Sequence, residues 1–140
     1  MSPEQSPEQS KKATSLDLLA GLRVVEIGLG LAGAVCGQTF VEAGAKVSRL
    51  SVNAEDGNVW IAVNDGKQRT ENRVEFERFL SAADLVIVDK TPSGASVTQG
   101  VIDKIRSDNS GILIVSITPF GLTGPDAEFT GGDLVSFHAS

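Results

Sequence analysis

The chain has 140 residues, enough for one domain around one hydrophobic core, and its 41% apolar residues supply that core and exclude a wholly disordered protein. A net charge of −6 repels phosphate backbones and anionic lipids, which makes nucleic acid and membrane surfaces poor partners. The single cysteine cannot form an internal disulfide or a zinc site, and no apolar run approaches the ~20 residues of a membrane span. We therefore expect a cytoplasmic protein without a metal.

The first segment is a polar tail. Residues 2–9 repeat Ser-Pro-Glu-Gln, and no apolar side chain precedes Leu16 apart from small alanine and the initial methionine. Such a composition does not bury enough surface to offset the entropy lost on ordering. The sequence thus predicts a disordered tail over residues 1–15 and one folded domain over residues 16–140.

Short β-branched runs alternate with helical periods from Leu22 onward. Residues 23–27 predict a strand, and apolar spacing over residues 32–43 predicts a helix that ends at Gly44. Residues 46–52 predict a second strand. The apolar run 59–63 ends at Asp65-Gly66, a dipeptide typical of tight hairpins, so we expect an antiparallel or irregular segment there.

The second half repeats the alternation of helix and strand. Phe76, Phe79, Leu80 and Ala83 have helical spacing, as do Val97, Val101, Ile102 and Ile105, whereas residues 85–88 and 112–115 are continuous apolar runs. Continuous apolar runs are typical of parallel strands buried on both faces. The sequence therefore predicts an α/β fold with a doubly wound, mostly parallel, Rossmann-like sheet and helices on both faces.

A glycine-rich loop follows the first predicted strand. Gly28, Gly30 and Gly33 have the spacing G-x-G-x-x-G and open the first predicted helix. In such a loop the backbone approaches a pyrophosphate, and the helix N-terminus offers free N–H groups to the anion. The alternative is that the glycines only allow close packing of strand and helix.

The acidic residue that holds the ribose of NAD, about 20 residues after such a loop, is missing. Arg49 lies in that region instead. A cation there suits a nucleotide with an extra phosphate, either coenzyme A or NADP, in preference to NAD. Equally, Arg49 can be a solvated cation at the edge of a strand.

Several segments in the same order resemble class III CoA-transferases, the group of formyl-CoA and carnitine CoA-transferases. The resemblance extends from residue 21 to residue 140. Asp89 stands where the family has an asparagine. The segments are 21–27, 31–33, 37–38, 42–47, 64–67, 82–87, 116–125 and 132–135.

This resemblance implies a Rossmann-like domain that binds coenzyme A, and catalysis by an aspartate. The carboxylate attacks the acyl-CoA to form a mixed anhydride, the CoA thiolate returns to form an enzyme thioester, and an incoming acid then takes up the CoA. In the family this aspartate follows the segment that Asp133 matches, so we expect it beyond Ser140. The catalytic residue is therefore unknown, and we expect the chain alone to bind rather than to turn over.

The predicted coenzyme A site combines backbone, charge and a second loop. Arg49 and Lys67 supply charge, and Gly121 and Gly124 shape a loop near the thioester. The substrates implied are an acyl-CoA and a carboxylic acid, and the expected partner is a second copy or the remainder of a longer chain. The residues predicted to approach the nucleotide through the backbone are Gly28, Gly30, Leu31, Ala32 and Gly33.

Two other functions remain as alternatives: the NADP-binding domain of an oxidoreductase, and an interaction module that has kept the fold without its ligand. Cys36 lies within the predicted apolar stripe of the first helix, which favours inert packing over a reactive thiol. His138 has no nucleophile paired with it by any motif, which favours a surface or core role. Lys67 and Arg69 can likewise be solvated cations of a turn.

Overall fold

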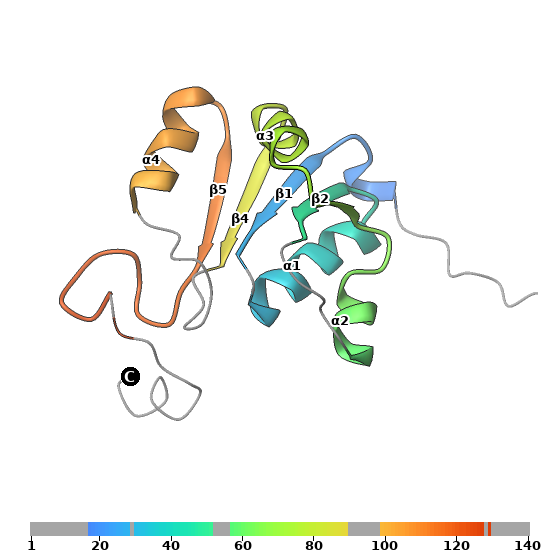
Figure 1. Ribbon diagram of the computed structural model, residues 1–140, viewed down its shortest axis with the longest axis horizontal. Helices are drawn as coiled ribbons and strands as arrows, with labels where there is room; N and C mark the ends of the chain where they lie inside the picture. Colours follow the sequence, from blue (N-terminus) through green and yellow to red (C-terminus); the bar gives the residue numbers. More distant parts are fainter. Residues whose placement is uncertain (1–16, 29, 52–56, 90–98, 128, 130–140) are drawn as a thin grey trace, which may run out of the picture.

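Five parallel strands form one sheet in the order β3-β2-β1-β4-β5, as Figure 1 shows for the computed structural model. The structure describes residues 17–28, 30–51, 57–89, 99–127 and 129. The strands are β1 (Arg23–Ile27), β2 (Lys46–Leu50), β3 (Gln68–Thr70), β4 (Leu85–Asp89) and β5 (Leu113–Ile117). The helices are α1 (Leu31–Glu42), α2 (Asn58–Val63), α3 (Arg73–Ser81) and α4 (Gln99–Asp108), after a short 3₁₀ turn, η1 (Asp17–Leu19).

Each face of the sheet has its own apolar cluster, because successive strand residues point to opposite faces. Val25 and Val88 pack with Phe76 of α3 and Ile102 of α4 on one face. On the other face Val24, Val47, Leu85 and Ile87 pack with Cys36, Phe40 and Val41 of α1. The predicted doubly wound α/β sheet with helices on both faces is therefore confirmed.

The prediction for residues 59–63 was wrong. They belong to the helix α2, whose Val59 and Ile61 are largely exposed, and the chain then turns at Gly66 (φ 76°) into the parallel strand β3. A short apolar run does not distinguish strand from helix, and the Asp65-Gly66 turn joins a helix to a strand here rather than two antiparallel strands.

The predicted burial of the last strand was also wrong. β5 forms one edge of the sheet, where Leu113 is 64% exposed and Val115 is 38% exposed. These side chains lie on the face that α1 covers, but the main contacts of α1 are with β1, β2 and β4, and it is Ile117, at the end of β5, that packs in the cluster on that face. The edge position is a property of the sheet order, which no local pattern encodes.

Helix α1 packs on the sheet through its smallest residues. Gly33, Ala34 and Gly37 are buried, whereas Val35, which the predicted stripe included, is 48% exposed. Small residues on this face let the helix lie close to the strands, which leaves little space between them for large side chains. The tail and Val97 lie outside the described residues.

The starts of α1 and α3 differ in how they are capped. Asn72 caps α3 through its side chain, which accepts hydrogen bonds from Val74 N and Glu75 N. Gly30, the residue at the same position of α1, has no side chain to do so. Among the described residues, no helix has the length and hydropathy needed to cross a membrane.

Candidate functional site

The carboxyl ends of β1 and β4 define the candidate site. From β1 the chain winds through β2 to β3 on one side, and it then crosses over to β4 and β5 on the other. Such a switch point leaves a crevice between the two loops, and ligands of open α/β sheets bind there. The loop from Gly28 to the start of α1 follows β1, and Asp89 ends β4.

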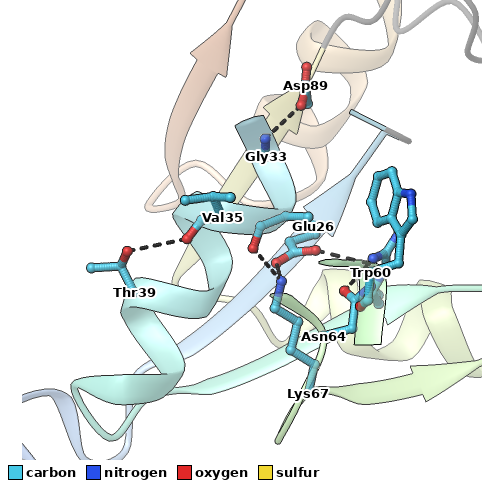
Figure 2. Close-up of polar contacts among 10 residues, drawn as sticks. Glu26, Gly33, Val35, Thr39, Trp60, Asn64, Lys67 and Asp89 are labelled. Carbon is cyan, nitrogen blue, oxygen red and sulfur yellow. Dashed lines mark hydrogen bonds and ion pairs between the residues drawn. The ribbon is translucent and has the colours of Figure 1, made fainter. Parts of the chain in front are cut away.

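The carboxylate of Asp89 lies against the first turn of α1. Gly33 N donates a hydrogen bond of 2.6 Å to Asp89 Oδ2, as Figure 2 shows. Gly33 is the third residue after Gly30, so this N–H is one that an N-cap side chain ordinarily satisfies. Asp89 therefore caps α1 from a neighbouring strand, and its negative charge lies at the positive end of the helix dipole.

Two glycines of the loop make room for Asp89. A Cβ at residue 28, where φ is 119°, would lie 2.2 Å from Asp89 O, and a Cβ at residue 33 would lie 2.7 Å from Asp89 Cβ. Burial raises the pKa of the Asp89 carboxyl, and the hydrogen bond from Gly33 acts in the opposite direction. The close approach of α1 to β4 therefore explains the glycines at residues 28 and 33 without a ligand.

A second buried carboxylate, that of Glu26 on β1, lies one helical turn further along α1. Lys67 Nζ lies 2.5 Å from Glu26 Oε1 and donates a 2.6 Å hydrogen bond to Ala34 O, while Arg49 Nε lies 3.8 Å from Glu26 Oε2 (Figure 2 shows the Lys67 contacts). A Cβ at residue 37 would lie 1.5 Å from Glu26 Oε1, so Gly37 is required for α1 to cover this carboxylate.

Asn64 completes this second group. Its Oδ1 accepts a hydrogen bond from Arg49 Nη1, and its Nδ2 donates to Trp60 O at 2.9 Å. The group, which we call the Glu26 cluster, consists of Glu26, Arg49, Asn64 and Lys67, all of which are buried. It joins β1, β2, α1 and the turn that precedes β3.

The predicted site residues fall into three places. Gly28, Gly30 and Gly33 lie at the switch point with Asp89, and Leu31 and Ala32 are exposed at the start of α1. Arg49 and Lys67 lie in the Glu26 cluster, where both pair with Glu26. Their contact with a phosphate stays a prediction, and it requires that these ion pairs open. The third place is the loop after β5, which holds the two remaining predicted glycines, Gly121 (φ 89°) and Gly124 (φ 110°).

The sequence alone predicted no role for Glu26 or Asp89. Both are acidic residues in strands whose other residues are almost all apolar, and that pattern is a usable signal: a buried carboxylate requires a cation or hydrogen-bond donors. Cys36 is partly buried, and desolvation raises the pKa of its thiol, in keeping with a packing role. Asp133 and His138 lie outside the described residues.

Two surface hollows lie near charged residues. One of about 250 Å³ is lined by Trp60, Ile61, Asn64, Asp65, Gly66, Lys67 and Arg69, beside the Glu26 cluster. A larger one of about 560 Å³ lies at the opposite edge of the sheet, around the ion pair of Arg23 and Asp84. Because ligands of this fold bind at the carboxyl edge, the larger hollow is the weaker candidate. Within the described ranges, no three His, Cys, Asp or Glu side chains gather as a metal site.

Comparison with known proteins places this geometry in a family. The chain is 28% identical over 144 aligned positions to the succinate–glutarate CoA-transferase of Agrobacterium fabrum; the match covers 84% of this chain and 36% of the relative. The solved structure of a CAIB/BAIF family protein from Brucella suis is 29% identical, with a TM-score of 0.64, over 82% of this chain and 37% of that one.

A hypothetical protein of Mycobacterium tuberculosis, also solved, is 25% identical, with a TM-score of 0.64, over 84% of this chain and 38% of that one. The chain therefore spans little more than a third of the length of these relatives. The sequence profile described as CoA-transferase family III matches residues 19–140, which is nearly the whole chain. On this match, and with the sheet and glycine loop described above, the chain belongs to CoA-transferase family III.

Proposed function

We propose that this chain forms the coenzyme A-binding part of an enzyme that transfers coenzyme A between an acyl-CoA and a carboxylic acid. Family membership and the similarity to a succinate–glutarate CoA-transferase support the substrate class. The observation that carries the proposal is the switch point: the glycine loop after β1 and the end of β4 meet at one sheet edge, the edge where α/β folds bind nucleotides.

In this proposal the backbone of Gly28, Gly30, Leu31, Ala32 and Gly33 forms one wall of the site. The loop of Gly121 and Gly124 forms the other, because β5 ends at the same edge as β1 and β4. Positive φ values at both glycines let this loop turn tightly at the end of the strand.

Arg49 and Lys67 affect this site indirectly, because they hold α1 in place. Lys67 donates to the carbonyl of Ala34 in α1, and both cations pair with Glu26, so they fix the helix whose N-terminus borders the site. Arg69, which lines the hollow of about 250 Å³, is the further cation near a nucleotide phosphate in this proposal.

Isothermal titration of the 140-residue chain with CoA, dephospho-CoA and NADPH tests the proposal. We expect CoA to bind and NADPH not to bind. Absence of heat with millimolar CoA overturns the proposal, and tighter binding of NADPH favours the oxidoreductase alternative. Equal affinity for CoA and dephospho-CoA overturns the predicted contact of Arg49, Lys67 or Arg69 with the extra phosphate of coenzyme A. It leaves the proposal that the chain binds coenzyme A in place.

A further inference from the structure

The loop that follows β5 begins with a turn that the side chain of Thr118 closes. Gly121 N donates a hydrogen bond of 2.7 Å to Thr118 Oγ1. Pro119 supplies the fixed φ that suits the second position of such a turn, and Gly121, at the fourth position, has a positive φ of 89° that glycine adopts without strain. Residues 118–121 therefore form a turn that their own side chains specify, and we call it the Thr118 turn.

The Thr118 turn directs the chain back onto the domain. Leu122, the next residue, packs against the apolar cluster that lies between the sheet and helices α3 and α4. Further along, Ala127 N donates to Gly124 O at 3.3 Å, and Ala127 is buried. The loop is thus anchored to the domain by a partly buried side chain before Gly124 and by a buried one after it.

Two phenylalanines bring the two ends of the loop together. The rings of Phe120 and Phe129 lie edge to face, with centroids 6.4 Å apart and an angle of 89° between the ring planes. Phe129 N also donates to Asp126 O at 2.9 Å. Compact surface loops whose ends lie close are packed by their own side chains in this way. The loop of Gly121 and Gly124 therefore holds its shape through contacts within this chain.

We propose that Thr118 is a positioning residue, whose hydroxyl fixes the wall of the coenzyme A site that Gly121 and Gly124 shape. Thr118 acts through Gly121, because the hydrogen bond to its oxygen closes the turn that returns Leu122 to the apolar cluster. This inference rests on the proposed function for the identity of the ligand. A loop that is ordered before binding loses little conformational freedom when the ligand binds, so the closed turn raises the affinity for coenzyme A.

Thr118→Val tests the inference, because it removes the accepting oxygen and keeps the branched shape of the side chain. Titration calorimetry measures the affinity of the 140-residue chain for CoA, and NMR measures how fast the amide hydrogen of Gly121 exchanges with water. In Thr118→Val we expect faster exchange at Gly121 and a CoA affinity lower by about two- to tenfold, the effect of one net hydrogen bond. Thr118→Ser keeps the oxygen, and we expect it to restore both values.

A matched control lies on α1. Thr39→Val removes a hydroxyl that donates to Val35 O at 3.2 Å within the helix, and we expect it to change neither the exchange at Gly121 nor the CoA affinity. Urea denaturation of the same chains separates positioning from stability, since we expect Thr118→Val to unfold near the wild-type midpoint. Thr118→Ala, which removes the same oxygen, replaces Thr118→Val if the latter does not fold.

Four results overturn the inference. The first is an exchange rate at Gly121 that is equal in Thr118→Val and the wild type. The second is an equal CoA affinity of these two chains, and the third is a loss of affinity in Thr118→Ser as large as that in Thr118→Val. The fourth is a urea midpoint of Thr118→Val far below that of the wild type, which would make the role structural. If the wild type binds no CoA, the proposed function fails, while the exchange at Gly121 still decides whether Thr118 closes the turn.

Discussion

The ammonium of Lys67 and the carboxylate of Glu26 form an ion pair of 2.5 Å between side chains that are 0% and 5% exposed. The two residues are far apart in the sequence, and the pair closes only when α1 packs over it, because Lys67 also donates to Ala34 O. The buried pair therefore ties the turn before β3 to both β1 and α1.

Removal of Lys67 takes the nearest cation away from the buried Glu26 carboxylate and leaves it with Arg49 Nε at 3.8 Å. We expect Lys67→Met to lower the free energy of unfolding by about 3–5 kcal/mol, and Glu26→Gln/Lys67→Met to recover part of that loss. Urea denaturation measures both. Lys104→Met is the matched control: Lys104 pairs with Asp108 on the surface at 2.7 Å, so we expect its loss to leave the urea midpoint nearly unchanged. Equal urea midpoints for the two lysine variants would contradict the burial of the Glu26 cluster.

Helix α1 has no room for a side chain at Gly37. Glycine to alanine in a helix normally stabilises a protein by up to about 1 kcal/mol. At Gly37 the new Cβ would lie 1.5 Å from Glu26 Oε1, so we expect Gly37→Ala to destabilise the fold by about 1–3 kcal/mol. Thermal unfolding compares it with Gly100→Ala at an exposed position of α4, where we expect no loss. A Gly37→Ala chain at least as stable as the wild type would refute the contact.

The ion pair of Arg23 and Asp84 makes stability depend on pH in the acid range. Hydrogen bonds from Arg23 lower the pKa of Asp84 to about 2, so the pair stabilises the fold above the ordinary aspartate pKa of 3.8 and is lost as pH falls toward 2. We expect the wild type to lose more stability than Asp84→Asn between pH 5 and pH 2, in urea titrations at each pH. Parallel losses in the two chains would show that the pair contributes nothing.

The exposed face of β5 predicts unequal effects of two truncations. Leu113 is 64% exposed, whereas Ile87 on the neighbouring strand is fully buried. We expect Leu113→Ala to cost about 0.5 kcal/mol or less and Ile87→Ala to cost about 2–5 kcal/mol. Urea midpoints of the two variants check this, and a large cost at Leu113 would mean that another part of the chain covers β5.

Much of the fold was predictable from sequence because strands and helices leave local patterns. The continuous apolar run of residues 85–88 identified the strand β4, which lies between β1 and β5, and the glycine at residue 44 marked the end of α1. The prediction for residues 59–63 was wrong because a short apolar run suits both a strand and an exposed helix. The prediction that β5 is buried on both faces was wrong because burial depends on which strand lies at the edge of the sheet.

The site was less predictable than the fold. The glycine loop was found by its spacing, but that spacing does not reveal that Asp89, 56 residues after Gly33, fills the first turn of α1. The pairing of Arg49 and Lys67 with Glu26 is similarly a contact between strands and a turn, set by sheet order and by the small residues of α1. Contacts of this kind arise from tertiary packing and leave only a weak trace in sequence, an acidic residue within an apolar strand.

Amide chemical-shift mapping of the 140-residue chain with coenzyme A tests the central claim most directly, because it reports which edge of the sheet binds the ligand. We expect shifts at Gly28, Gly30, Gly121 and Gly124, around the carboxyl ends of the strands, and none at Arg23 or Gly111 at the opposite edge. Shifts confined to the opposite edge, or no shifts with millimolar coenzyme A, would contradict it.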